Sequence, residues 1–251
     1  MKISKLLLLS CLLSAIVIPS QSHAYGNESG KTELLEARTV VLSPEVNNSK
    51  GYELEIQKSG DQVIYGFKDV PVEDRKEAMK YLNSLIDARS TQTPSAKASL
   101  QSTSTIDLTS NGSYYGNNFG EDSRNGNAQN YSFVNLDFNV GFWTATMDST
   151  GGQSASWFGT GNPTQIVFNE SASYSGVSVT VGWPPSATGS STSKSWSSQP
   201  VTGNPASATH APLHASSATG IYSATFSDTA DIYLSSTIYR PTTYIKFNYV
   251  K

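Results

Sequence analysis

The chain has 251 residues, a formal net charge of −3 and only one cysteine, Cys11. A slight excess of acids gives no electrostatic attraction for nucleic acid, so nucleic acid is not expected as a partner. A single cysteine excludes an internal disulfide scaffold and a metal site built on several thiolates. Composition therefore removes several classes of function without identifying one.

Residues 1–24 have the pattern of a secretory signal peptide. Lys2 and Lys5 precede an apolar run from Leu6 to Ile18, and small residues at Ser22 and Ala24 suit cleavage before residue 25. The run is shorter than the roughly 20 residues of a membrane-spanning helix, so we expect no transmembrane helix. Cleavage would remove two lysines, no acid and Cys11, which lowers the net charge from −3 to −5. We expect a secreted, extracellular protein without thiol chemistry.

The next residues, 25–89, predict a charged β-β-α unit. Alternation over 52–57 and 63–67, on either side of a glycine-containing turn, indicates two paired strands. Residues 73–89 place Met79, Leu82, Leu85 and Ile86 on one helical stripe. A unit of this size can bury little apolar surface on its own. We therefore expect that it either packs against the rest of the chain or serves as a pro-segment.

Composition changes after this unit. Residues 90–105 are small and polar without a period, which predicts a linker. The remaining segment, 106–251, is poor in charge and rich in serine, threonine and aromatic residues. We expect it to be a separate β domain.

Strand patterns dominate that domain. Apolar and polar residues alternate over 134–142, and again over 177–183 and 245–249. Shorter candidate strands are 165–169, 221–226 and 231–239. No crossover helix is visible, so the strands should pair antiparallel. The predicted fold is mainly β, an antiparallel β-sandwich or jelly roll preceded by the β-β-α unit.

Four aromatic residues are the candidate ligand-binding residues: Trp143, Trp157, Phe158 and Trp196. Strand alternation points Trp143 to the polar face, and the other three lie in segments rich in glycine or serine. Exposed rings can stack on a sugar, a lipid interface or a protein. The alternative is that these rings fill gaps beneath long loops.

Catalytic and metal sites have weaker support. A glycosidase needs two carboxylates, and Glu121 and Glu170 are the only glutamates after residue 99. A surface turn and a solvent-facing strand end explain them equally well. His210 and His214 could form a metal pair with Asp228 or Asp231 as third ligand, but Pro212 separates them. We expect solvated loop histidines, and no metal or other cofactor.

Three hypotheses about function follow. The first is an exported, non-enzymatic β-sandwich interaction protein that binds a glycan, a cell-envelope component or a partner protein through exposed aromatic residues. The second is a secreted β-pore-forming or antibacterial toxin, because Val134–Phe142 has the length of a membrane strand. The third is a carbohydrate-active enzyme.

Overall fold

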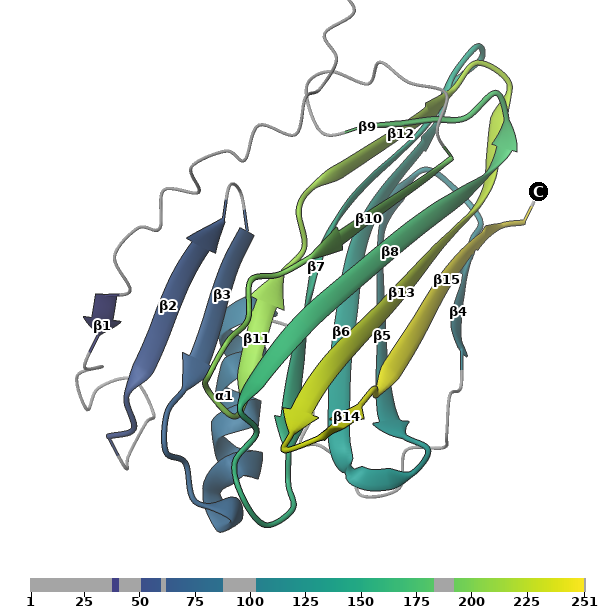
Figure 1. Cartoon of the computed structure of the whole chain (residues 1–251). Coiled ribbons are helices and arrows are strands. Elements are labelled where there is room, and N and C mark those ends of the chain that lie inside the picture. Colours follow the sequence, from purple (N-terminus) through teal and green to yellow (C-terminus); the bar gives the residue numbers. More distant parts are fainter. Residues whose placement is uncertain (1–37, 41–50, 60–61, 88–102, 183–191, 251) are drawn as a thin grey trace, which may run out of the picture. The chain divides into compact units, whose positions relative to one another are not determined.

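The computed structural model describes residues 38–40, 51–59, 62–87, 103–182 and 192–250. These residues form two β-sheets that pack face to face (Figure 1). The expected signal peptide and residues 90–102 of the expected linker lie outside the described residues, and residues 103–105 already belong to a strand. Within the described ranges, no helix combines the length and apolar character needed to cross a membrane.

The first sheet has nine strands in the described part of the chain: β1 (Arg38–Val40), β2 (Leu54–Ser59), β3 (Gln62–Phe67), β5 (Gly112–Asp122), β6 (Asn125–Val140), β7 (Ala145–Trp157), β9 (Thr180–Gly182), β11 (Ala206–Thr209) and β12 (Leu213–Ser217). The second has six: β4 (Thr103–Leu108), β8 (Gln165–Val177), β10 (Ser193–Ser197), β13 (Gly220–Leu234), β14 (Thr237–Tyr239) and β15 (Thr242–Tyr249). The pairs are antiparallel except β4 with β15, which is parallel. The predicted mainly β sandwich is confirmed.

Strand β7 organises the first sheet. Strand β6 pairs along one side of it, while β11 and β12 follow each other along the other side. Strand β3 pairs with β11, with Ala206 opposite Gly66. The β2–β3 hairpin is therefore part of the first sheet.

A short 3-10 turn, η1 (Val72–Asp74), leads into helix α1 (Arg75–Ile86) on the outer face of this sheet. Met79 packs against Tyr131 and Phe133 of β6, and Ser154 of β7 donates a hydrogen bond to Asn83. The helix is shorter than the predicted 73–89. Leu85, expected on the apolar stripe, is exposed.

Arg75 ties the helix to the loop after β7. Its buried guanidinium donates to four backbone carbonyls and to the side chain of Asn162. The carbonyls belong to Val70, Trp157, Gly159 and Gly161, at 2.8 to 3.1 Å. A guanidinium has five N–H donors in a fixed plane, so one side chain can satisfy all these acceptors.

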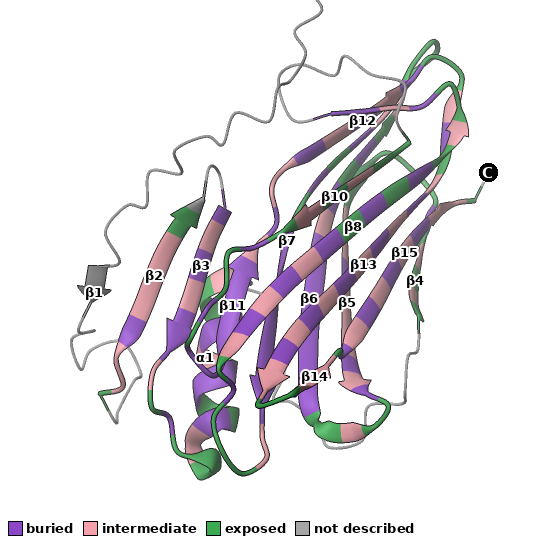
Figure 2. Cartoon of the chain, viewed as in Figure 1, coloured by how far each residue is buried: buried purple, intermediate pink, exposed green. Residues whose placement is uncertain are grey.

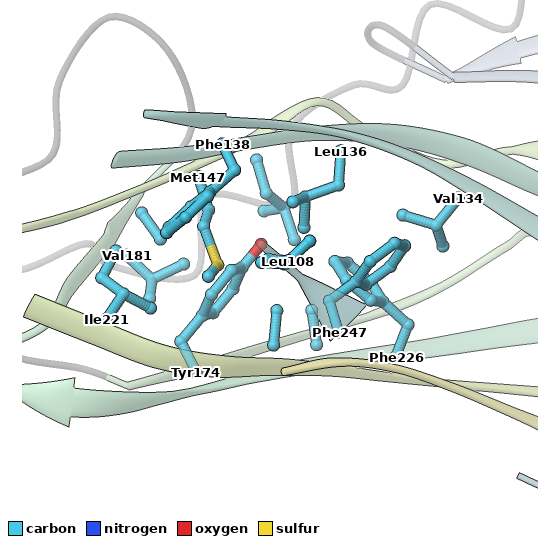
Figure 3. Packing of buried hydrophobic residues seen from close by; sticks show 14 of the residues in the cluster. Leu108, Val134, Leu136, Phe138, Met147, Tyr174, Val181, Ile221, Phe226 and Phe247 are labelled. Carbon is cyan, nitrogen blue, oxygen red and sulfur yellow. The ribbon is translucent and has the colours of Figure 1, made fainter. Parts of the chain in front are cut away.

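Side chains of both sheets meet in two apolar clusters. The larger, shown in Figure 3, contains Leu136 and Phe138 from β6 with Phe226 and Phe247 from the second sheet. The smaller contains Trp157, Ile166, Phe168 and Ile232 near the other end of the same strands. Buried and partly exposed residues alternate along β8, β13 and β15 (Figure 2), as expected when one face of a strand is covered.

A polar layer separates the two clusters at the same level on each strand. Its members occupy core-facing positions, with apolar residues on both sides along each strand. They are Asn130 and Ser132 on β6, Gln153 on β7, Glu170 on β8, Asp228 on β13, Thr243 on β15 and His210 between β11 and β12. All seven are buried.

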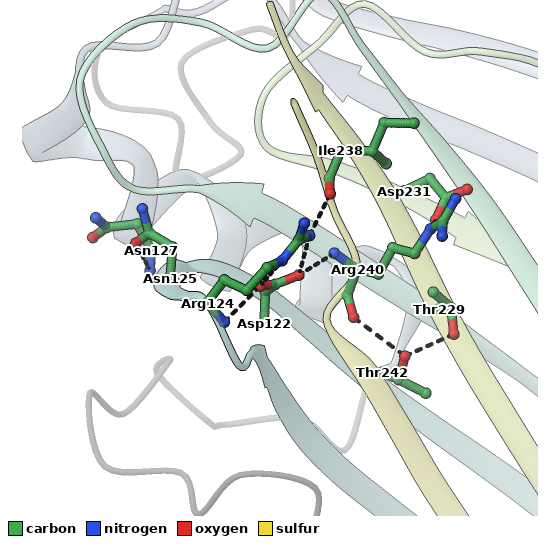
Figure 4. A network of polar contacts seen from close by, with 9 residues as sticks. All are labelled: Asp122, Arg124, Asn125, Asn127, Thr229, Asp231, Ile238, Arg240 and Thr242. Atoms are coloured by element: carbon green, nitrogen blue, oxygen red, sulfur yellow. Dashed lines mark hydrogen bonds and ion pairs between the residues drawn. The ribbon is translucent and has the colours of Figure 1, made fainter. Parts of the chain in front are cut away.

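Ion pairs hold the β5–β6 end of the sandwich together (Figure 4). Asp122 pairs with Arg124 at 2.9 Å and accepts a hydrogen bond from the backbone N–H of Arg240 at 2.6 Å. Arg240 pairs in turn with Asp231 on β13 at 2.9 Å. These contacts connect the hairpin of one sheet to the strands of the other.

Several predicted strands differ from the observed ones. Strand β6 ends at Val140, so Phe142 does not continue its apolar face. Strand β8 ends at Val177, because Ser178 adopts a positive φ of 51° that interrupts extended backbone. Trp183, the last residue of the predicted strand 177–183, lies outside the described residues.

Arg75→Met should lower the free energy of unfolding by about 3 kcal/mol, because buried carbonyls would lose a charged donor. Urea unfolding followed by circular dichroism measures this effect. Lys76→Met is the matched control, since Lys76 is exposed on the same helix turn. Equal loss of stability in both variants would contradict the assigned role of Arg75.

Candidate binding site

The turn between β6 and β7 carries the two most exposed aromatic rings among the described residues. The backbone N–H of Gly141 donates to the carbonyl of Thr144 at 2.7 Å, which closes a four-residue turn. Phe142 is 89% exposed and Trp143 is 76% exposed. Their ring centroids lie 4.7 Å apart with planes at 89°, an edge-to-face pair. The predicted exposure of Trp143 is confirmed, and Phe142 joins it because the strand ends before it.

Other exposed apolar side chains lie at the same end of the sandwich. Val177 ends β8, Tyr222 lies near the start of β13, and Val250 follows β15. Strand pairing brings these termini to the end that carries the β6–β7 turn. Of the seven large hydrophobic residues that are exposed in the described chain, five lie at this end. We call it the aromatic end.

A polar pocket of about 560 Å³ lies on the β5, β6 and β7 strands next to the turn. It is lined by Asn111, Gly112, Ser113, Asp137, Phe138, Asn139, Thr146 and Asp148. Phe138 is the only apolar member, and its side chain belongs to the core. Asn139 and Thr146 form a cross-strand pair, one pair below Val140 and Ala145 at the base of the turn.

Two carboxylates face each other in this pocket. Asp137 on β6 is the cross-strand partner of Asp148 on β7. Ser113 donates a hydrogen bond to Asp137, and His214 Nδ1 lies 2.6 Å from Asp148 Oδ1. Like charges directly opposite on neighbouring strands destabilise a sheet, and the contacts with Ser113 and His214 offset part of this repulsion.

The other three predicted ligand-binding aromatics are not exposed rings. Trp157 is 4% exposed, so the expectation for it is wrong. Its ring stacks on Tyr239 with centroids 4.9 Å apart, and its indole N–H donates to the carbonyl of Thr160. Phe158 and Trp196 are partly buried against apolar clusters. Trp157 packs against the loop that follows β7, whereas Trp196 lies on strand β10 and covers the smaller apolar cluster.

His210, expected in a solvated loop, is instead buried in the polar layer. Its Nδ1 lies 3.6 Å from Glu170 Oε1 and its Nε2 lies 3.4 Å from Asp228 Oδ1. Glu170 and Asp228 are cross-strand partners on β8 and β13, so the imidazole of one sheet faces both carboxyl groups of the other. Gly151 leaves room for it, since a Cβ there would lie 2.6 Å from His210 Nδ1. Glu170 is likewise buried rather than at a solvent-facing strand end.

The net effect of burial and neighbouring charges raises the pKa of both Glu170 and His210. Burial raises the pKa of Glu170 to about 7, with Asp228 adding to the rise and His210 opposing it. Burial alone would lower the pKa of His210, but Asp228 and Glu170 together raise it to about 9. Glu170 and His210 therefore stay protonated to a higher pH than they would in water.

The remaining candidate residues are dispersed. Glu121 accepts a hydrogen bond from Gln129 at the β5–β6 hairpin, and no described contact joins it to Glu170. His214 is partly exposed beside Asp148, whereas His210 faces the interior. Among the described residues, no group of three or more His, Cys, Asp or Glu side chains is arranged to hold a metal ion. Asp231 pairs with Arg240 rather than with either histidine.

The pocket residues were not predicted from the sequence. A signal was present, since Phe142 and Trp143 follow a clean alternating strand and are bracketed by Gly141 and Thr144, a combination typical of a hairpin turn. The alternation over 134–142 places Asp137 and Asn139 on the polar face of the strand but does not identify their partners. Their pairing with Asp148 and Thr146 depends on the register of β7, which has no readable period.

Comparisons with known proteins find little similarity. No protein-family model matches the chain, and no curated protein matches it. Among solved structures, the N-terminal domain of PorA matches with 12% sequence identity and a TM-score of 0.26. That match covers 60% of this chain and 90% of the other. A TM-score this low carries no argument about fold or function.

The polar layer predicts that stability falls as the pH rises from about 5 to about 9. In the folded chain the pKa values of Glu170 and His210 lie above their ordinary values of 4.5 and 6.5. Both groups therefore bind protons more tightly when the chain is folded. The contribution of Glu170 is complete below pH 4.5 and is lost as the pH passes about 7. That of His210 is complete below pH 6.5 and is lost as the pH passes about 9. Urea midpoints at pH 5, 7 and 9 measure the decline.

Glu170→Gln separates this effect from general charge repulsion in an acidic protein. The variant should show a smaller decline between pH 5 and 7 than the unmodified protein, because glutamine does not titrate. Glu121→Gln removes the other glutamate of this region and should leave the decline unchanged. Parallel pH profiles for all three proteins would show that Glu170 is not the responsible group.

Proposed function

We propose that this chain is an exported, non-enzymatic interaction protein that binds a glycan or another cell-envelope component at its aromatic end. The observation that carries the proposal is the exposed Phe142–Trp143 pair at the tip of the β6–β7 hairpin. Large rings held in water are costly, and at the end of a rigid sheet they are typical of a binding surface. The signal-peptide pattern of residues 1–24 supports export.

The two ends of the sandwich support the same proposal. Where ion pairs and hydrogen bonds of Asp122 and Arg240 join the sheets, the side chains already have partners. At the aromatic end the rings touch each other, and their remaining surface is open. Trp and Tyr side chains combine a large apolar surface with a polar atom, which suits contact with a hydroxyl-rich ligand.

A membrane-active toxin is the second candidate. The observation that favours it is the gathering of Val177, Tyr222 and Val250 at the same end as the two rings. Aromatic and aliphatic side chains of this kind can enter the interfacial region of a bilayer. Dye release from vesicles of neutral phospholipid would support this candidate, and intact vesicles at saturating protein would count against it.

The leading proposal predicts that replacing both rings weakens retention on envelope material at least about tenfold. An aromatic anchor in an interface typically contributes about 2 kcal/mol or more, and 1.4 kcal/mol corresponds to a factor of ten. The test compares the unmodified mature protein with a Phe142→Ser, Trp143→Ser double variant in pull-down on cell envelopes and insoluble polysaccharides.

The matched control is Val72→Ser with Leu85→Ser. These two residues are the exposed large hydrophobic side chains outside the aromatic end, among those described, and lie near helix α1. The control variant should be retained as the unmodified protein is. Equal retention of all three proteins would refute binding through the rings.

A further inference from the structure

The polar pocket next to the β6–β7 turn has the chemistry of a sugar subsite. It is an open depression of about 560 Å³ on the sheet surface, which suits one unit of an extended chain better than an enclosed small molecule. Its lining offers carboxylate, amide and hydroxyl groups, with no aliphatic side chain among them. Such a lining can donate and accept hydrogen bonds around a hydroxyl-rich ring, and it offers nothing to an acyl chain.

The pocket is held in shape before any ligand arrives. Asn111 Nδ2 donates to Asn139 Oδ1 and to the carbonyl of Val140, both at 3.1 Å. The backbone N–H of Val140 donates back to Asn111 Oδ1 at 2.8 Å. Tyr114 fixes the preceding turn through hydrogen bonds with the backbone of Thr109 and Ser110. Groups fixed in this way lose little freedom on binding.

Charge restricts what the pocket can accept. Asp137 and Asp148 are opposite each other, and no lysine or arginine is among the lining residues. A uronic acid or a sulfated sugar would add a third negative charge and be repelled. A neutral sugar can donate its hydroxyls to both carboxylates, and an amino sugar adds a cation that relieves their repulsion.

The turn that carries the rings adjoins the pocket along strands β6 and β7. The turn that bears Phe142 and Trp143 begins directly beyond Asn139–Val140 on one strand and Ala145–Thr146 on the other. A chain bound in the pocket can therefore continue onto an aromatic face, which stacks well on the C–H face of a sugar. Hydrogen bonds in the pocket and stacking at the tip would act on adjacent units of one glycan.

Resting on the proposed function of the aromatic end, we propose that this pocket binds one uncharged or amino sugar unit of a glycan whose next unit stacks on Phe142 and Trp143. Glucosamine oligomers should bind most tightly, N-acetylglucosamine oligomers and neutral glucan oligomers more weakly, and galacturonic acid oligomers not at all. Isothermal titration calorimetry of the mature protein with these four probes measures the order.

Variants test the residues. Asp137→Asn and Asp148→Asn should each weaken binding of glucosamine oligomers about tenfold or more, because a charged acceptor is lost. Asp137→Asn should keep or raise the urea midpoint, since the opposed charges are removed. Asp148→Asn also removes the contact with His214 Nδ1 at 2.6 Å, so Asp137→Asn is the variant that separates binding from stability. Asp107→Asn, at an exposed aspartate near the end of β4 that does not line the pocket, should leave binding unchanged. A merely structural role for Asp137 would lower the midpoint instead.

The outcomes distinguish this inference from the proposed function. If the double ring variant loses envelope retention while both aspartate variants keep it, or if galacturonic acid oligomers bind best, the sugar subsite is wrong and the aromatic end remains the binding surface. If the ring variant is retained as well, the proposed function fails too. Binding in the predicted order, lost in the aspartate variants and kept in Asp107→Asn, establishes the subsite.

Discussion

A layer of buried polar side chains crosses the sandwich between its two apolar clusters, and it constrains how the two sheets face each other. His210 reaches from one sheet to Glu170 and Asp228 of the other, and Asn130 donates to Gln153 and to the carbonyl of Asp228, both at 3.2 Å. Buried polar groups without partners cost free energy, and the layer is only partly satisfied: among the described residues, both carboxyl oxygens of Asp228 and Oε2 of Glu170 have no hydrogen-bond partner. A slip of one residue on any strand would turn its polar member outward and an adjacent outward-facing side chain inward. The layer thus fixes register where the apolar clusters alone would not.

Small residues make this interior possible. Strand β7 is buried on both faces from Gly151 to Trp157, with the second sheet on one side and helix α1 on the other. A Cβ at Gly151 would lie 2.3 Å from the carbonyl oxygen of Phe133, so no larger residue fits without moving the strand. Ser154 and Ser156 find hydrogen-bond partners in Asn83 and Asn204. Much of the serine in this domain is therefore structural, which differs from a surface lined with hydroxyl groups for contact.

The polar layer and the small residues of β7 also limit what the sequence could predict. Alternation revealed β6, β15 and the β2–β3 hairpin, because their core-facing residues are large and apolar. Strand β7 was missed, since glycine, serine and alanine show no period when both faces are covered. The single long strand β13 was read as two, because Asp228 occupies a core-facing position in its middle. His210 and Trp157 were misplaced for a related reason: their partners, Asp228 and Tyr239, are distant in sequence.

The difference between the two ends then follows from how each is built. At the β5–β6 end, Asp122 and the backbone of Arg240 join strands of opposite sheets, so both sheets must stay in contact there. At the aromatic end, the polar layer and the larger apolar cluster already hold the sheets together beneath the turns. The side chains of the β6–β7 turn therefore do not have to contribute to packing, and Phe142 and Trp143 are exposed there. Exposed rings at that turn reduce solubility without stabilising the fold, and the proposed function accounts for them by a contact outside the molecule.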